Sequence, residues 1–333
     1  MIESIDKSKA SFGSPRVLLT GGTGFFGRSI LRRLLINRSF RDVGPTILVV
    51  TRSPETFLSN YPEFNNLAWL SFYRGDVLEY SSLPSDGRFS HILHAATEST
   101  IGPSLDPVCR YDEIVSGTRN LLDYAVNNKI KRFLLTSSGG VYGPQPETSP
   151  TIDESYLGIP DPLDPASAYS MAKRSAEHMC CLYSNKYDIE ACIARCFSFF
   201  GPDLPRNAHF AIGNFVNNAL NLDEIIIEGD GSPIRSYLDQ NDLASWLLCI
   251  LERGISGEAY NVGSNEAISL YDLAHLVASI FCPDKNVKIL GRPKYSGRNL
   301  YVPNITKANK ELGLNVSIPL SESLSNVAKL TCD

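Results

Sequence analysis

The sequence contains no apolar segment as long as the roughly 20 residues that a membrane-spanning helix needs. Its beginning, Met1 to Ser14, is polar and lacks the apolar centre of a secretory signal. We therefore expect a cytoplasmic protein that does not bind a membrane, with a loose N-terminal tail over residues 1–15.

The chain also lacks the usual patterns of metal sites and disulfide frameworks. None of the 8 cysteines forms a Cys-x-x-Cys pair, and the 5 histidines show no metal-ligand spacing. Cys180 and Cys181 are adjacent, while Cys192 and Cys196 lie in an apolar segment. These positions favour buried free thiols in a reducing compartment and predict no metal.

No block of like charge is present. The 31 basic and 36 acidic residues are scattered and give a net charge of -5, which does not favour a nucleic-acid partner. A chain of 333 residues is long enough for one large α/β unit with an appended lobe.

A glycine-rich segment follows the first apolar run, at Thr20 to Gly27, and apolar residues at helical spacing come after it. This order is typical of the strand, turn and helix that bind a dinucleotide. Gly21 and Gly24 would bring the backbone close to a pyrophosphate, and Gly27 would let the helix pack against the strand. Phe25 and Phe26 are the remaining candidate cofactor contacts in this segment. An ordinary glycine-rich turn is the alternative.

Apolar runs and helical patterns alternate along the chain. The runs after the first are continuous, which is typical of parallel strands covered on both faces; they lie at 46–50, 68–73, 91–94, 133–137, 189–195 and 259–262. Helical patterns lie at 108–127, 167–186 and 241–252. We predict an α/β fold with a Rossmann-like doubly wound parallel sheet and a smaller mixed α/β C-terminal lobe that binds substrate.

The predicted sheet part covers residues 16–200 and is completed by 235–263. The lobe would comprise 201–234 and 264–330, including the segments 202–222 and 269–282 and the tail from Asn304, which do not fit the alternation. It should cap the carboxyl ends of the strands, where ligands bind in open α/β sheets.

Tyr169 and Lys173 are one helical turn apart in a helical pattern, so both side chains reach one small molecule. A free tyrosine has a pKa near 10, and only a neighbouring positive charge makes it a base at neutral pH. Lys173 would supply such a charge.

Further motifs follow the strands in order. They include Gly75-Asp76-Val77, His94-Ala95-Ala96, the segment 117–122, Ser138 with Val141-Tyr142-Gly143, Arg195 with Phe200-Gly201-Pro202, Gly229-Asp230-Gly231 with Arg235, and Tyr260-Asn261-Val262-Gly263. With the glycine segment and the Tyr169 and Lys173 pair, these motifs resemble an extended short-chain dehydrogenase/reductase that acts on nucleotide-linked sugars. The resemblance runs from about Arg16 to about Gly313.

The resemblance implies an NAD(P)-dependent enzyme that moves a hydride at C4 of the sugar. Tyr169 would exchange a proton with the sugar oxygen, Lys173 would also hold the nicotinamide ribose, and Ser138 would hydrogen-bond the same oxygen. Asp76 would contact the adenine, and Val77, Ala95 and Ala96 would line the cofactor channel. Turn-forming roles are the alternatives for Ser138 and Asp76.

Cofactor choice depends on the end of the second strand. The sequence there is Val49-Val50-Thr51-Arg52-Ser53, without the acidic residue that usually binds the ribose of NAD. Arg52 favours NADP(H), although an arginine stacked on adenine would give the same pattern, so NAD(H) stays open.

Two departures from the family narrow the reaction. Dehydratases carry an Asp-Glu pair where this chain has Gly139 and Gly140, so a 4,6-dehydratase and a decarboxylase that uses the same glutamate are disfavoured. Epimerising reductases place a Cys at the position of Gly140, which is also missing. What remains is a 4-keto reductase, favoured by Arg52, or a C4 epimerase with bound NAD.

The substrate would be a nucleoside-diphosphate sugar. Ser198 replaces the usual Asn of the family, His209 is either a substrate contact or a packing residue, and Arg235 and Arg298 match places where relatives hold the diphosphate. Surface ion pairing is the alternative for both arginines. The resemblance also implies a homodimer through the helices at 108–127 and 167–186. A non-catalytic dinucleotide-binding sensor is the remaining alternative, although it would not need Tyr169 and Lys173.

Overall fold

The computed structural model describes residues 15–41, 44–85, 88–97, 104–146, 148–291 and 300–332. Its centre is a seven-stranded sheet with the order β11-β6-β5-β4-β1-β2-β3, and all neighbouring strands run parallel. The strands are β1 (Arg16–Thr20), β2 (Thr46–Thr51), β3 (Leu70–Arg74), β4 (His91–His94), β5 (Arg132–Ser138), β6 (Glu190–Cys196) and β11 (Ala259–Val262). These bounds confirm the predicted doubly wound fold.

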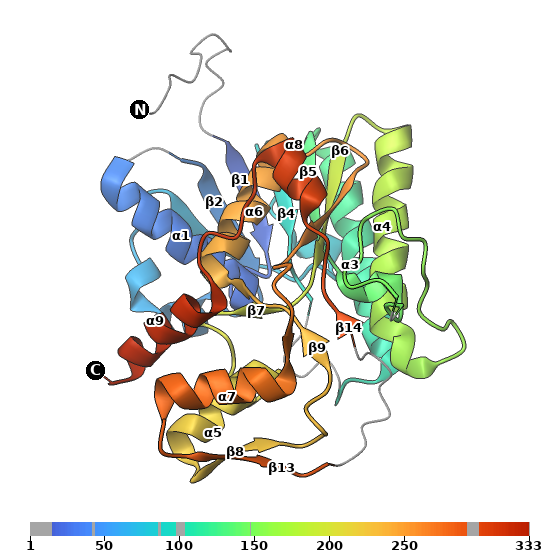
Figure 1. Cartoon of the computed structure of the whole chain (residues 1–333). Helices are drawn as coiled ribbons and strands as arrows, with labels where there is room; N and C mark the ends of the chain where they lie inside the picture. The colour runs from blue at the N-terminus through green and yellow to red at the C-terminus, as the bar shows by residue number, and fades with distance from the viewer. Residues whose placement is uncertain are drawn as a thin grey trace.

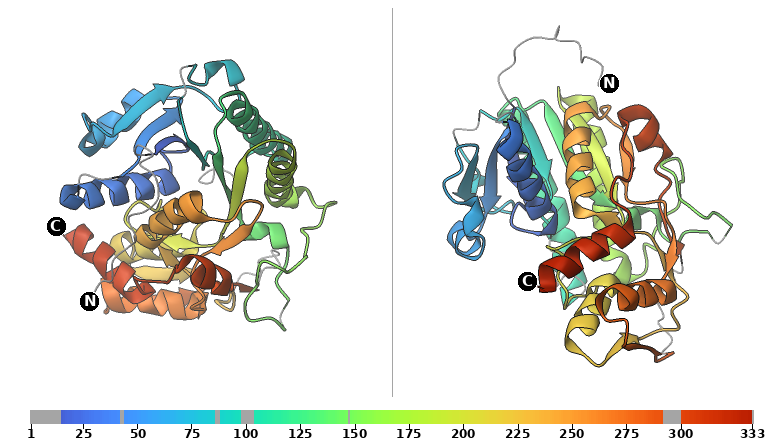
Figure 2. Two further views of the ribbon diagram at one scale, coloured as in Figure 1. Left: turned by 90° about the horizontal axis from the view of Figure 1, so that it is seen from above. Right: turned by 60° about the vertical axis from the view of Figure 1, so that its left-hand side comes forward.

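Helices cover both faces of this sheet (Figures 1 and 2). On one face lie α1 (Phe25–Arg41) and α6 (Gln240–Arg253), which pack against each other and against the sheet. On the other face lie α3 (Pro107–Asn127) and α4 (Ala168–Lys186), which also pack together. Most residues of the inner strands are buried, which explains why their sequences are continuously apolar, whereas the edge strand β3 is largely exposed.

Local sequence signals set several helix ends. The Asp106 carboxylate accepts hydrogen bonds from the backbone N-H groups of Val108 and Cys109, directly before Pro107 begins α3. Asp239 caps α6 in the same way. The short helix α2 (Pro54–Asn60) begins with a proline after β2.

The lobe lies below the carboxyl end of the sheet in Figure 1. Its core is formed by α5 (Ala211–Asn221), α7 (Leu270–Phe281) and the parallel pair β8 (Glu224–Ile227) and β13 (Asn286–Ile289). A three-stranded sheet joins β9 (Ile234–Arg235), β12 (Ile268–Ser269) and β14 (Leu300–Tyr301), and a two-stranded one joins β7 (Phe199–Phe200) and β10 (Leu238–Asp239).

Two helices end the chain in different surroundings. Helix α8 (Thr306–Leu312) contacts α6 and β11, and its residues Ala308 and Leu312 belong to the same core as Trp246. Helix α9 (Leu320–Cys332) contacts α7 of the lobe. The predicted lobe included both helices, and the apolar residues of α8 pack in the core beside the sheet. The limits of the two parts stay a prediction.

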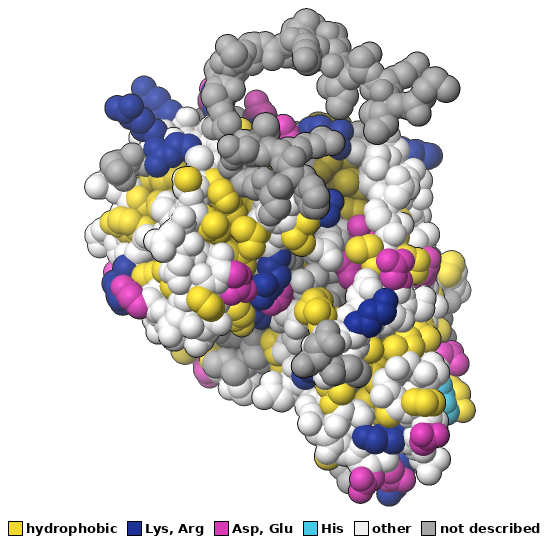
Figure 3. Space-filling model, turned by 90° about the vertical axis from the view of Figure 1, so that its left-hand side faces the viewer, with side chains coloured by type: hydrophobic (Ala, Val, Ile, Leu, Met, Phe, Trp, Pro, Cys, Tyr) yellow, Lys and Arg dark blue, Asp and Glu magenta, His cyan; other side chains and the backbone are white. Residues whose placement is uncertain are grey.

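The surface and the cysteines complete this description. Basic and acidic side chains are spread together over the face shown in Figure 3. Within the described part of the chain no helix is long and apolar enough to cross a membrane. Cys180, Cys192 and Cys196 are buried free thiols as predicted, whereas Cys109 and Cys181 are exposed because they lie on the outer faces of α3 and α4.

Candidate active site

A cavity of about 1140 Å³ lies between the carboxyl edge of the sheet and the lobe. The sheet side contributes the glycine segment, the end of β5 and the first turn of α4, and the lobe side contributes residues of α5, β8, β9 and β14. It therefore lies at the carboxyl ends of the strands, beside the switch point between β1 and β4, where ligands bind in this type of fold.

The glycine segment has the close backbone contacts that its sequence predicts. Gly21 has a φ of +71°, and a side chain there would overlap the backbone of Ala95. A side chain at Gly27 would overlap the backbone of Gly22, so only glycine lets α1 begin so close to β1.

Gly24 has more room. A Cβ atom there would meet nothing closer than the Gly21 carbonyl oxygen at 3.5 Å, and Gly21 and Gly24 both line the cavity. Together with the N-terminus of α1, this opening fits the pyrophosphate of a dinucleotide. Phe25 and Phe26 line the same cavity, and the ring of Phe26 packs edge-on against Phe199 with centroids 5.2 Å apart.

The three candidate catalytic side chains meet at the cavity wall. Ser138 is buried, its oxygen accepts a hydrogen bond from the Gly140 N-H at 3.1 Å, and Tyr169 lines the cavity with it. Lys173 is buried, and its Nζ donates to Thr97 Oγ1 and to the Thr136 carbonyl oxygen, each at 2.8 Å. The structure thus brings together the serine, the phenol and the ammonium that the sequence suggested.

Burial changes the proton affinity of these groups. It raises the pKa of Tyr169 to about 12, and it lowers the pKa of Lys173 to about 8. The charged form of each group is disfavoured because water is excluded. A cofactor or substrate that brings compensating charge is therefore needed before Tyr169 ionises easily.

A side chain at the position after Ser138 would meet two aromatic side chains, which would have to move. A Cβ atom on Gly139 would lie 2.7 Å from the Phe197 ring and 2.8 Å from the hydroxyl oxygen of Tyr301. The rings of Phe197 and Tyr301 pack together with centroids 4.6 Å apart. These two aromatic residues fill the space in which a carboxylate at position 139 would have to lie.

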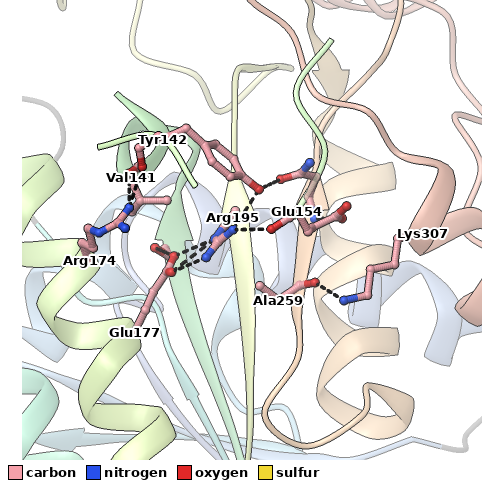
Figure 4. Close-up of polar contacts among 11 residues, drawn as sticks. Val141, Tyr142, Glu154, Arg174, Glu177, Arg195, Ala259 and Lys307 are labelled. Carbon is pink, nitrogen blue, oxygen red and sulfur yellow. Dashed lines mark hydrogen bonds and ion pairs between the residues drawn. The ribbon is translucent and has the colours of Figure 1, made fainter. Parts of the chain in front are cut away.

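A buried polar network holds the end of β5 behind the cavity (Figure 4). Ser137 donates a hydrogen bond to Glu177 Oε1 at 2.5 Å, and Arg195 makes an ion pair with Glu177 at 2.8 Å. Arg195 also donates to the Tyr142 hydroxyl, which in turn donates to Asn261 Oδ1 at 2.8 Å. Strands β5, β6 and β11 and helix α4 are thereby fixed relative to one another, which orients the neighbouring Ser138.

Comparison with known proteins agrees with this geometry. The sequence model of the NAD dependent epimerase/dehydratase family matches residues 17–263. The chain belongs to this family.

Similar sequences and structures lie across the same family. UDP-glucuronic acid decarboxylase 4 of Arabidopsis thaliana is 32% identical over 94% of this chain and 68% of its own length. UDP-glucuronic acid decarboxylase 1 of Danio rerio is 28% identical over 93% and 71%. UDP-glucose 4-epimerase of Thermotoga maritima has the same fold, with a TM-score of 0.80, 24% identity and coverage of 96% of this chain and 100% of that one. RMD of Pseudomonas aeruginosa, solved with NADPH, has a TM-score of 0.77, 22% identity and coverage of 95% and 98%.

Most of the other residues predicted to bind the cofactor do not line the main cavity. Arg52 is exposed directly after β2, and its carbonyl oxygen accepts a hydrogen bond from Arg74 at 3.0 Å. The Asp76 carboxylate accepts a hydrogen bond from the Leu78 N-H at 3.0 Å, which is the turn-forming role named as its alternative. Val77 and Ala96 are half-buried, and Ala95 lines the cavity. Their contacts with a cofactor stay predictions.

The substrate candidates are placed on the opposite side of the cavity. Ser198, His209 and Arg235 all line it, and the His209 ring packs on Phe210 with centroids 4.2 Å apart. Arg298 lies outside the described residues. No group of three or more metal-ligating side chains is found in the described ranges.

Sequence reasoning missed three side chains that line the cavity near Tyr169. They are Arg110, Cys196 and Tyr301. None belongs to the motifs used for the prediction, and each comes from a different element, so only the folded structure brings them to the phenol. For Cys196 the sequence indicates only a thiol within an apolar segment.

Proposed function

We propose that the protein reduces the 4-keto group of a nucleoside-diphosphate sugar, with NADPH as the reductant. The observation that carries this proposal is the meeting of Ser138, Tyr169 and Lys173 with the glycine segment in one cavity. A serine, a phenol and an ammonium that line one cavity suit proton transfer to a carbonyl oxygen. The bound nicotinamide would supply the hydride. Gly21 and Gly24 would hold the pyrophosphate of the cofactor, and Lys173 would hold its nicotinamide ribose.

Each residue would have one role in this reaction. Tyr169 would donate its proton to the sugar O4 as that oxygen gains negative charge. Ser138 would donate a hydrogen bond to the same oxygen, while its own oxygen accepts from the Gly140 N-H. Lys173 would keep a positive charge near the phenol while its burial keeps water away.

Gly139 supports reduction over elimination. The family resemblance attributes loss of water to an Asp-Glu pair at positions 139 and 140, and one form of decarboxylation to the same glutamate; this chain has glycine at both positions. Here Phe197 and Tyr301 occupy the space that a side chain at position 139 would need. Because Gly140 offers no carboxylate, we do not propose for this chain the decarboxylase activity that the similar sequences carry in their names.

Two arginines at the ends of β2 and β3 support NADPH over NADH as the cofactor. Arg52 is exposed at the end of β2, and Arg74 at the end of the neighbouring β3 approaches its backbone. Two guanidinium groups there suit a ribose 2'-phosphate. Arg74 also makes an exposed ion pair with Glu55, so Arg52 would be the main contact.

The decisive experiment identifies the cofactor that co-purifies with the protein and then measures turnover. The panel should contain UDP- and dTDP-linked 4-keto and 4-hydroxy sugars, with NADPH oxidation as the readout. We expect NADPH to be consumed by a 4-keto sugar. Tightly held NAD with exchange of C4 epimers would establish the epimerase alternative, and carbon dioxide released from UDP-glucuronate would establish a decarboxylase. No turnover with any sugar would favour a non-catalytic sensor.

Three further expectations remain proposals: cytoplasmic location, the division into a sheet part and a substrate lobe, and a homodimer. For the dimer, α3 and α4 form a continuous pair whose outer face carries Val108 and Leu182, 66% and 52% exposed. Such apolar side chains suit a helical interface between two copies.

A further inference from the structure

Arg110 lies over the ring of the proposed acid/base tyrosine. It belongs to the first turn of α3, and its guanidinium carbon is 4.3 Å from the centroid of the Tyr169 ring. The same residue lines the cavity beside Ser138 and Lys173. A cation over a phenol ring is attracted by the electrons of its face, and the attraction grows when the site excludes water.

We propose that Arg110 is a positioning residue that acts through Tyr169, because its permanent positive charge stabilises the tyrosinate left when the phenol gives up its proton. The inference rests on the acid/base role proposed above for Tyr169. It adds that a second, pH-independent cation from another helix serves the same phenol.

Lys173 alone does not provide this charge over the whole pH range. Its Nζ is 5.9 Å from the Tyr169 ring centroid, farther than the Arg110 guanidinium carbon. Burial lowers the pKa of Lys173 to about 8, so the ammonium loses its proton as the pH rises through that value. A guanidinium stays protonated in proteins. Above pH 8, Arg110 is therefore the cation that remains at the ring.

The groups that face Tyr169 come from several elements and act in both directions. Burial raises the pKa of Tyr169 most, and Tyr301 on β14 and Cys196 on β6 raise it further. Arg110 on α3 and the hydrogen bond with Ser138 lower it. Arg110 is thus the cation that opposes the effect of burial on the phenol.

The pKa of Lys173 also depends on the positive charge of Arg110. Burial lowers its pKa most, Cys196, Glu177 and Cys180 raise it, and Arg110 lowers it. The neighbouring His94 is held neutral by burial and by Lys173 itself. Removal of the guanidinium should therefore raise the pKa of Lys173.

The test compares Arg110→Met, which keeps the length but not the charge, with Arg110→Lys, which keeps a charge. Arg119→Met is the matched control, because Arg119 is exposed on the same helix. The first readout is the titration of Lys173 in the cofactor-free protein, followed by nuclear magnetic resonance of labelled lysine and assigned with Lys173→Met. We expect an upward shift of about one pKa unit in Arg110→Met and none in Arg119→Met.

The second readout is the pH profile of turnover with the sugar found in the panel above. We expect kcat of Arg110→Met to fall about tenfold near neutral pH with little change in KM. The ratio of wild-type to variant kcat should then grow as the pH passes the titration of Lys173, since the variant keeps no cation at the ring. Arg110→Lys should recover part of the loss.

An unshifted Lys173 titration, or a kcat ratio that stays constant with pH, would overturn the proposal. If Arg110→Met does not fold, Arg110→Gln is measured in the same way. If no sugar is turned over, the proposed reaction fails while the Lys173 titration still decides whether Arg110 supplies charge to the site. If a sugar is reduced and the titration does not move, the role of Arg110 alone fails.

Discussion

The two walls of the cavity are built in different ways. One wall is the edge of the seven-stranded parallel sheet, where Ser138 ends β5 and Lys173 lies in the 19-residue helix α4, both buried. The other wall combines helix α5 of the lobe with loops and with short strands such as β9 and β14, each of two residues. The groups proposed for proton transfer thus lie on long, well-packed elements, and the groups proposed for recognition lie on short ones.

This difference has a functional consequence. A rigid wall keeps the reacting groups in a fixed arrangement, which hydride and proton transfer require. Short strands and loops tolerate changes of sequence without unfolding the sheet, so substrate preference can vary while the chemistry stays the same.

The comparison predicts that damage to the sheet wall mainly affects kcat. Tyr169→Phe removes the proposed proton donor without changing the shape of the ring, so kcat for the 4-keto sugar should fall about a hundredfold or more. Tyr183→Phe is the matched control, because Tyr183 lies on the same helix and hydrogen-bonds Asp123, away from the cavity. Near-normal turnover of Tyr169→Phe would show that another group transfers the proton.

Damage to the lobe wall should mainly affect KM. Arg235 lies on β9 and lines the cavity, where a guanidinium suits the diphosphate of the substrate. Loss of a charge-assisted hydrogen bond in Arg235→Met should raise KM about tenfold and leave kcat nearly unchanged. Lys288→Met is the control, since Lys288 makes an exposed ion pair with Glu224 elsewhere in the lobe. An equal loss in kcat would remove the contrast between the two walls.

A smaller effect should appear in the stability of the sheet wall at mildly acid pH. His94 is buried, hydrogen-bonds Thr20 and Thr118, and has its pKa lowered by burial to about 3. The unfolded chain binds a proton at this histidine below about pH 6.5, whereas the folded protein does not, so stability is present above that pH and is lost as the pH falls towards 3.

At pH 6 this histidine should lower the free energy of unfolding by about 0.7 kcal/mol relative to pH 7. Urea unfolding of the wild type and of His94→Gln at several pH values measures it. The difference between the two proteins should become smaller as the solution is acidified. A difference that does not change with pH would show that His94 gains a proton in the folded state.

The sequence predicted the sheet wall well because its signals are local. Two of its features each lie within one short segment: the turn between β1 and α1, and the pair of Tyr169 and Lys173. In both, the spacing of residues along the chain is enough to predict how they are placed. Continuous apolar runs located the strands of the main sheet for the same reason.

The strand pairing of the lobe wall, and the side chains that pack around Tyr169 and Gly139, could not be predicted from local patterns. Strand β9 pairs with β12 and β14, which come from distant parts of the chain, and no local pattern encodes that pairing. Arg110 reaches Tyr169 only because α3 packs against α4, and Tyr301 reaches Gly139 only through the position of β14. Their roles follow from packing between elements.

The aromatic pair beside Gly139 also constrains how this chain can change during evolution. A carboxylate at position 139 would meet the Phe197 ring and the Tyr301 hydroxyl, which both lie within 2.8 Å of the Cβ position. An acidic residue at position 139 would therefore require these two side chains to shift or to be replaced by smaller ones. Because Phe197 directly follows β6 and Tyr301 lies on β14, such a change would involve two segments that are far apart in the sequence.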